Sequence, residues 1–250
     1  MIAIISPAKN MRPQSRPGVT PRRPRFPEQT SRLLEQLRAY SPAELESLMG
    51  INPELALNAA AYFADCDLSA PGWTALTAYN GLQYKNIDPL TLTDGDFAFL
   101  ADHLFILSGF YGLVRPDDGI QPYRLEMGGR FRYEGQTLYR FWGSSLYEGL
   151  FSRCEPVIDL ASTEYSKAIV PHLQEGDRLI HVDFLVQRKG ALKSLATEAK
   201  MARGQMARAI AQNRWDDPEE LKAFDWNGYE FSEALSSESK LVFVQAFAGK

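Results

Sequence analysis

Two kinds of hydrophobic pattern alternate along the chain. Short apolar runs are typical of buried strands, whereas apolar residues spaced three or four apart are typical of helices that bury one face. The strand-like runs are 2–6, 104–107, 157–160, 179–186, 191–196 and 241–244. The helix-like stretches are 28–39, 42–50, 52–63, 93–103 and 198–214, with a short helix beginning at Asp217. Because both kinds are intermixed without a repeat or a long linker, we predict one α+β domain spanning residues 1–250, with a mixed β-sheet flanked by helices.

Two of these helices form a hairpin within residues 42–64. The first begins with the capping box Ser41-Pro42-Ala43-Glu44, and the second with Asn52 ahead of a proline. Helix, tight turn and helix resemble the helix-hairpin-helix motif, in which turn amides and a helix N-terminus hold a phosphate without reading bases. Gly50 and Asn52 are therefore candidate nucleic-acid contacts. Asn52 stands where a glycine is usual and the second helix lacks basic residues, so an ordinary packed hairpin is the competing interpretation.

The composition is that of an ordinary globular protein. The chain has 250 residues, of which 45% are hydrophobic and 23% charged, enough to bury a sizeable core. No apolar run approaches the ~20 residues of a transmembrane helix, and no basic segment precedes the first apolar run as in a secretory signal. Cys66 and Cys154 are isolated, which fits a reducing compartment. We expect a cytoplasmic protein without membrane contact, and we favour a monomer although the sequence does not fix the oligomeric state.

Charge is distributed unevenly. The net charge of −4 argues against general coating of nucleic acid. Residues 1–27, however, contain six basic residues, six prolines and no acid, and so form an extended cationic strap. The strap is either a solvated surface segment or a segment that faces phosphates.

The segment Leu107–Met127, LSGFYGLVRPDDGIQPYRLEM, concentrates residues able to bind a ligand. It follows a buried strand, and its glycines and prolines stiffen the chain around an Asp-Asp-Gly turn. We expect Arg115, Tyr123, Arg124 and Glu126 to lie on a rigid loop, where binding residues are common.

Other basic and hydroxyl side chains follow the first and third strand-like runs or lie along the long helix. These candidates are Lys9, Ser162, Tyr165, Lys167, Lys200 and Arg203. A lysine that leaves a strand end is a mobile point charge for an anion, and the amides of a new helix favour an anion as well. The competing interpretations are structural: Lys167 pairs with Glu164 on the surface, and the basic residues of the long helix cover the edge of the core with their stems.

Recognised catalytic signatures are missing from the sequence. We find no nucleophile triad, no pair of catalytic carboxylates, no Walker loop and no Rossmann glycine pattern. The histidines at 103, 172 and 181 share no metal-ligand spacing with each other or with the cysteines, so we predict neither a metal site nor a cofactor. The residues by themselves indicate a site that faces an anion, but they do not identify a reaction.

The ordered motifs of the chain resemble those of the YaaA family of bacterial peroxide-stress proteins. The resemblance covers nearly the whole chain and rests on Ser6-Pro7-Ala8-Lys9, Leu107-Ser108-Gly109, Pro122-Tyr123-Arg124-Leu125-Glu126-Met127, Leu160-Ala161-Ser162 and Ala202-Arg203-Gly204. The departures are small: Asp159 stands where asparagine is usual, and Tyr79 where phenylalanine can occur. The resemblance implies an α+β fold with a positively charged cleft and a helix-hairpin-helix-like element. It also implies DNA binding, a role in lowering free intracellular iron, and limited DNA damage under hydrogen peroxide.

Three hypotheses follow. In the first, the protein binds double-stranded or locally unpaired DNA without sequence specificity. Its phosphate contacts are Lys9, Arg115, Arg124, Lys167, Lys200 and Arg203, and Tyr123 or Tyr165 stacks on an unpaired base. In the second, an enzyme acts on a nucleotide or damaged base in a small pocket lined by Lys9, Arg124, Glu126 and Tyr165, with Glu126 as candidate catalytic base. In the third, the protein chelates iron directly, which would need a cluster of Cys, His and carboxylates that the sequence does not show.

Overall fold

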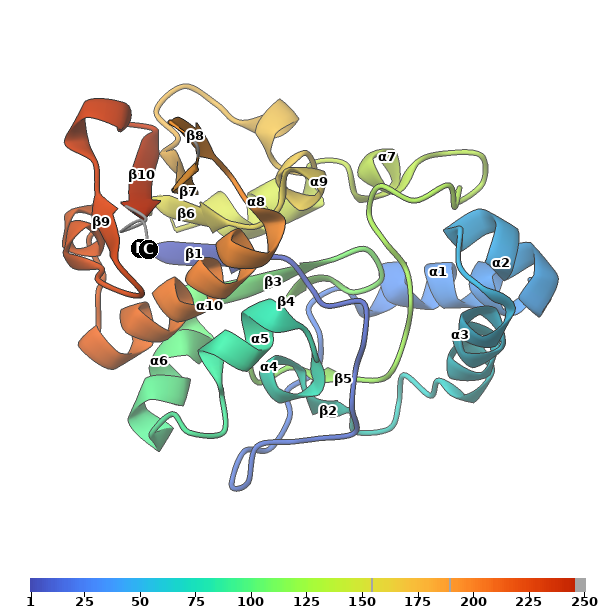
Figure 1. Ribbon diagram of the computed structural model, residues 1–250. Helices are drawn as coiled ribbons and strands as arrows, with labels where there is room; N and C mark the ends of the chain where they lie inside the picture. Colours follow the sequence, from blue (N-terminus) through green and yellow to red (C-terminus); the bar gives the residue numbers. More distant parts are fainter. Residues whose placement is uncertain (154, 189, 246–250) are drawn as a thin grey trace.

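A mixed β-sheet forms the centre of the computed structural model, which describes residues 1–153, 155–188 and 190–245; Cys154 lies outside these residues. Within them, eight strands join in the order β4-β3-β1-β6-β7-β10-β9, with β8 paired to β7 (Figure 1). The strands are β1 Ile2–Ile5, β3 Leu104–Ser108, β4 Gly112–Val114, β6 Val157–Leu160, β7 Leu179–Arg188, β8 Ala191–Lys193, β9 Tyr229–Phe231 and β10 Lys240–Gln245. Strands β2 (Trp73–Thr74) and β5 (Gly119–Ile120) pair separately. The predicted α+β fold with a mixed sheet is confirmed.

Strand β1 lies inside the sheet and is parallel to both of its neighbours. Ala3 is in register with Leu104 of β3 on one side and with Ile158 of β6 on the other. All four residues of β1 are at most 1% exposed. A strand covered on both faces reads as a continuous apolar run, which is why IAII shows no alternation.

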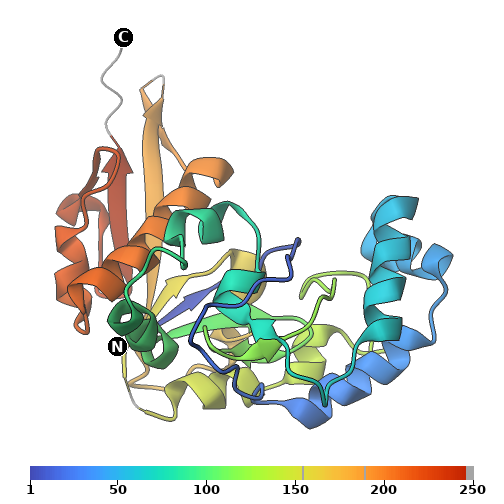
Figure 2. The same ribbon diagram turned by 90° about the horizontal axis from the view of Figure 1, so that it is seen from below.

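Helices cover the sheet and form a separate group at one end of the molecule. The helices are α1 Pro27–Arg38, α2 Pro42–Met49, α3 Pro53–Asp65, α4 Ala75–Ala78, α5 Leu82–Ile87, α6 Asp94–His103, α7 Leu138–Trp142, α8 Ser145–Phe151, α9 Thr163–Ser166 and α10 Ala196–Asn213, and the 3₁₀ helices are η1 Val170–His172, η2 Pro218–Ala223 and η3 Glu233–Leu235. Helix α10 packs on α5, α6 and β7. Helices α1, α2 and α3 lie together at the end opposite β9 and β10 (Figure 2).

Local capping signals predicted where several helices begin. Ser41 and Glu44 form the expected capping box, as do Thr93 and Asp96, and the side chain of Asn52 accepts a hydrogen bond from the Leu55 amide. Asp217 caps η2, a 3₁₀ helix. The helical hairpin α2–α3 is therefore present, whereas its use as a helix-hairpin-helix element stays a prediction.

Some predicted elements differ in the structure. The segment Leu107–Met127 is not one loop, because it contains β4 and β5. The run 191–196 divides between β8 and the start of α10 at Ala196. Between β5 and α7, an isolated bridge joins Tyr133 and Gln136. Each difference reflects a tertiary pairing that local sequence does not encode.

The arginines of the cationic strap hold it to the protein body. Arg16 is 7% exposed, and its Nη1 donates to the carbonyl of Pro89 (2.5 Å). Arg22 pairs with Asp117 (2.8 Å), and Arg25 donates to a backbone carbonyl. Arg16 is therefore buried and not solvated, and phosphate contact by the strap stays a prediction. In the described part of the chain, no helix combines the length and apolar character needed to cross a bilayer.

Candidate functional site

A cavity of about 290 Å³ opens at the carboxyl ends of β1 and β6. From β1 the chain connects to β3 on one side, and later returns to β6 on the other side of β1. The carboxyl ends of such strands form a crevice where the direction of the connections switches, and ligands of open α/β sheets bind there. We call this space the strand-end cavity. Its walls come from residues 6–10, 80–84, 123–126 and 162–165 and from α10.

The loops after β1 and β6 are joined at the base of the strand-end cavity. The amide of Ser162 donates to Oγ of Ser6 (2.8 Å), and the two hydroxyl groups lie 3.2 Å apart. The hydroxyl of Tyr84 donates to the carbonyl of Ser6 (2.9 Å). Ser162 occupies the N-cap position of α9, but its side chain makes no capping hydrogen bond. Its hydroxyl faces Ser6 instead.

Four cationic and two acidic side chains line the strand-end cavity, so the formal charge of its lining is +2. They are Lys9, Arg124, Lys200 and Arg203, with Glu126 and Glu164. Glu126 forms an ion pair with Lys9 (Nζ–Oε1 2.9 Å), and the same Oε1 lies 3.7 Å from Nη2 of Arg124. Lys9 is 64% exposed whereas Arg124 is 11% exposed, so the lysine is the mobile cation and the arginine the fixed one.

Helix α10 brings Lys200 and Arg203 to the strand-end cavity through an unusually close approach to α5. A Cβ atom on Gly204 would overlap the carbonyl oxygen of Gln83 and lie 2.8 Å from Cβ of Asn86. Only glycine lets the two backbones come this near. Burial lowers the pKa of the Arg203 guanidinium, and the carboxylates of Asp159 and Asp183 oppose that shift.

Asp159 is a buried hydrogen-bond acceptor whose charge acts on Arg203. It is 3% exposed and accepts hydrogen bonds from the Ser166 hydroxyl (2.6 Å) and the Ala161 amide (2.9 Å). Its Oδ2 also lies 2.7 Å from Nδ1 of His181. That hydrogen bond raises the pKa of the His181 imidazole. In each of these contacts an oxygen of Asp159 serves as the acceptor.

The two candidate stacking tyrosines are wall residues. Tyr123 is 5% exposed and Tyr165 is 6% exposed. The hydroxyl of Tyr123 lies 2.6 Å from that of Tyr79 and 2.7 Å from that of Ser108, and burial raises the pKa of Tyr123 to about 12. Burial also raises the pKa of Tyr165. Both rings remain neutral hydrogen-bonding groups with little surface free for stacking.

The structure brings together eight of the predicted site residues and separates four. The strand-end cavity is lined by Lys9, Tyr123, Arg124, Glu126, Ser162, Tyr165, Lys200 and Arg203. The other four lie outside it. Gly50 ends α2 with a φ of 61°, Asn52 caps α3, Arg115 lies over the ring of Phe105 (5.9 Å), and Lys167 is exposed at the end of α9. Nucleic-acid contact by the other eleven residues, and catalysis by Glu126, stay predictions.

Sequence reasoning missed several residues of the strand-end cavity. Glu164 had been considered only as a surface partner of Lys167, yet it accepts a hydrogen bond from the Gly128 amide (2.9 Å). Asn80 and Gln83 also line the cavity. The signal that marked them was the dense polar and aromatic run 79–84, which the structure places beside Lys9.

The strand-end cavity can bind an anion and offer hydrogen-bond acceptors to the rest of a ligand. Its ammonium and guanidinium groups suit phosphate, and its carboxylates and amides suit donor groups on a sugar or base. Among the described residues, no group of three or more His, Cys, Asp or Glu side chains is placed to hold a metal ion.

The fold and this cavity define an α+β protein with a cationic ligand site at its strand ends. A family model described as peroxide stress protein YaaA matches residues 1–235. A UPF0246 protein of Limosilactobacillus fermentum is 42% identical over 246 residues, covering 98% of this chain and 100% of the relative. UPF0246 proteins of Acaryochloris marina and Clostridioides difficile are 41% and 37% identical, each covering 98% of this chain and 100% of the relative. The chain belongs to the YaaA family of peroxide stress proteins.

Proposed function

We propose that this peroxide stress protein binds DNA without sequence specificity, with the strand-end cavity as part of the contact surface. The observation that carries the proposal is the convergence of Lys9, Arg124, Lys200 and Arg203, from three distant parts of the chain, on one cavity. Clustered cations attract the phosphate backbone whatever the base sequence. The cavity is too small for a duplex, so a locally unpaired nucleotide would enter it while duplex phosphates contact its rim.

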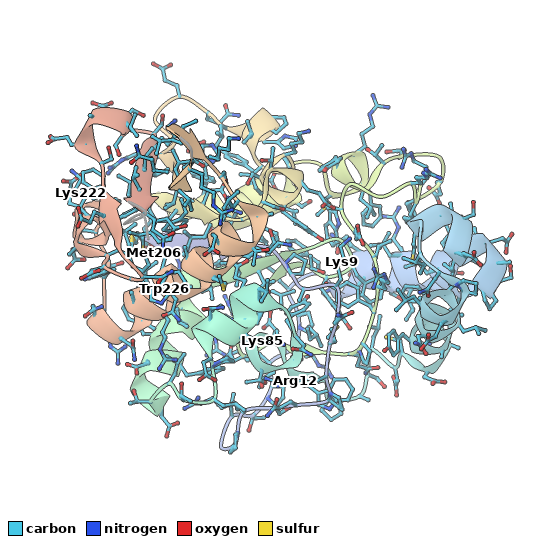
Figure 3. The ribbon with its side chains drawn as sticks, viewed as in Figure 1. Lys9, Arg12, Lys85, Met206, Lys222 and Trp226 are labelled. Atoms are coloured by element: carbon cyan, nitrogen blue, oxygen red, sulfur yellow. The ribbon has the colours of Figure 1, made fainter. Side chains whose placement is uncertain are left out.

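Salt dependence of binding tests the proposal. We expect labelled duplex DNA and bubble DNA to bind at low salt in a fluorescence anisotropy titration, with affinity falling as salt rises. Lys200→Gln should reduce the slope of log K against log [salt] by about 0.9 for the phosphate contact it loses. Lys222→Gln is the matched control, because Lys222 carries the same charge on η2 at the end of the molecule near β9 and β10, away from Lys9 (Figure 3). Binding that is undetectable at low salt, or insensitive to salt, would refute DNA binding.

Control of iron belongs to the same proposal as an indirect effect. Bound protein would shield DNA from iron-driven oxidation in a peroxide-stressed cytoplasm and help to limit free iron without holding the metal itself. Equilibrium dialysis with ferrous iron should leave no metal on the protein. Stoichiometric retention of iron would contradict this part and favour direct chelation.

One observation favours an enzyme as the second candidate. Glu126 lies 2.9 Å from Lys9 in a cavity the size of a small-molecule site, an arrangement that suits a general base. A screen of nucleosides, nucleotides and lesion-bearing DNA should then show turnover by the natural protein that Glu126→Gln abolishes. Equal turnover by the two would count against Glu126 as the base, and turnover by neither would count against an enzyme.

A further inference from the structure

The two arginines of the strand-end cavity each have a donor that the protein leaves without an acceptor. Within the described residues, Nε of Arg124 and Nε of Arg203 are buried and have no hydrogen-bond partner. Buried donors in native proteins are almost always satisfied, so both need an explanation. The Nε–H and one Nη–H of a guanidinium point the same way and match two oxygens of a phosphate. Two such arginines in one cavity indicate a ligand with several oxyanion oxygens.

Arg203 is built in as a fixed member of this pair. The close approach at Gly204 sets the distance between α10 and α5. The carboxylates of Asp159 and Asp183 act on Arg203 from β6 and β7, and Asp159 is itself held by Ser166 and the Ala161 amide. The helix packing and the attraction of these carboxylates favour one position of the Arg203 guanidinium before any ligand arrives.

Arg124 differs because a carboxylate of the protein already approaches it. Oε1 of Glu126 lies 3.7 Å from Nη2 of Arg124 and 2.9 Å from Nζ of Lys9. The distance to Arg124 exceeds that of a hydrogen bond, so the contact leaves the arginine's donors underused. A carboxylate and a phosphate present oxygens to a guanidinium in the same way. Glu126 thus approaches Arg124 as a ligand phosphate would, but with a weaker contact.

We propose that Arg124 and Arg203 form a clamp for one phosphate group of a nucleotide, and that Glu126 is the internal carboxylate which this phosphate displaces from Arg124. The inference rests on the proposed function, since it names the ligand unit taken by the same cavity. A volume of about 290 Å³ lies at the small end of ligand sites, which admits one nucleotide. The phosphate accepts a hydrogen bond from the orphaned Nε–H of each arginine, and Asn80 and Gln83 remain for the sugar and base.

Calorimetric titration with 5′-deoxyadenosine monophosphate, deoxyadenosine and inorganic phosphate tests the clamp. The nucleotide should bind and the nucleoside should not, because the phosphate supplies the charge-assisted hydrogen bonds. Arg203→Lys keeps the positive charge but loses the fork, so it should weaken nucleotide binding about 10- to 100-fold. Arg153→Lys is the matched control. Arg153 donates to the Asp102 carbonyl near the amino ends of β3 and β6, opposite the strand ends that form the cavity, and its replacement should leave binding unchanged.

Glu126→Gln separates displacement from the other roles of this residue. Removing the competing carboxylate should tighten nucleotide binding about two- to fivefold. Unchanged or weaker binding would overturn the displacement by showing that Glu126 orients Arg124 or Lys9 for the ligand. Binding by Arg203→Lys equal to that of the natural protein would overturn the clamp in favour of a point charge. If Arg203→Lys melts at a lower temperature, Arg124→Lys provides the same comparison from the other side of the clamp.

Titration with a second ligand, a short single strand of DNA, tells whether the bound phosphate belongs to DNA or to a free nucleotide. A single-stranded pentanucleotide that binds more tightly than the mononucleotide identifies DNA as the source, and the reverse order identifies free nucleotide; both results support the clamp. Salt-dependent duplex binding without any binding of mononucleotide or pentanucleotide overturns the clamp and leaves the DNA-binding proposal standing. Mononucleotide binding without DNA binding refutes that proposal and leaves the clamp standing.

Discussion

Gly204 gives the sharpest test of how the strand-end cavity is assembled. Replacing glycine by alanine inside a helix ordinarily stabilises a protein by about 1 kcal/mol, because alanine loses less backbone entropy. Here the added methyl group would overlap the Gln83 carbonyl and lie 2.8 Å from Cβ of Asn86. Carbon atoms in contact sit about 3.5–4.0 Å apart, so α10 and α5 must separate by roughly an ångström. We therefore expect Gly204→Ala to destabilise the protein.

The size of the effect follows from two opposing terms. Overpacking costs about 1–3 kcal/mol, and a backbone obstacle that cannot rotate away places this site near 3 kcal/mol. The propensity gain of about 1 kcal/mol offsets part of it, which leaves a loss of about 2 kcal/mol. For a chain of this length the melting temperature should fall by about 4–8 °C. Arg203 is adjacent to the displaced residue, so nucleotide binding should weaken as well.

Urea unfolding followed by circular dichroism measures the loss. Ala209→Gly on the same helix is the matched control, since it makes the reverse exchange where residue 209 is partly buried. It should cost about 1 kcal/mol through propensity. A Gly204→Ala protein as stable as the natural one, or more stable, would show that the approach of α10 to α5 is not limiting.

Two further predictions concern pH. Asp118 is 2% exposed, and burial raises its pKa to about 7; it therefore holds a proton that the unfolded chain has lost, and stability falls as pH rises from about 4 to 7. Asp118→Asn should remove this loss of stability, which is worth up to about 4 kcal/mol at 1.36 kcal/mol per pKa unit. Urea unfolding midpoints at pH 5 and pH 8 measure the loss. The prediction fails if the midpoints of Asp118→Asn change with pH as those of the natural protein do. The hydrogen bond to Asp159 raises the pKa of His181, so its stabilisation is complete below pH 6.5 and is lost as pH rises through the raised value. Melting temperatures of His181→Gln should lack this small loss above pH 6.5, and an unaltered profile would assign it to another group.

Local sequence predicted the beginnings of helices because the signals there are local. Ser41 with Glu44 and Thr93 with Asp96 satisfy amides within three residues of themselves, so the pattern and its structural effect coincide. Strand order has no such signal. The partner strands of β1 start at Leu104 and Val157, and the sequence IAII contains no signal that specifies them.

The candidate site was predicted in part for the same reason. The sequence predicts Arg115 and Arg124 on one rigid loop, but Arg115 directly follows β4, and β5 lies between the two arginines. Arg115 therefore lies over the Phe105 ring while Arg124 enters the strand-end cavity. The close helix contact at Gly204 could not be predicted either, since a glycine within a helical pattern indicates only lower helix propensity. Its meaning depends on α5, more than a hundred residues earlier.

The pairing of β1 sets when the ligand site can exist during folding. The strand leading to Lys9 is completed by partners about 100 and 155 residues later, and Arg203 arrives later still. Contacts of such long sequence separation form slowly and close large loops. As the chain emerges from the ribosome, most of the sequence must be synthesised before β1 can pair with a strand on each side. Nucleotide binding would thus report completed folding of the sheet, a stricter criterion than helix content, which the local capping signals can establish early.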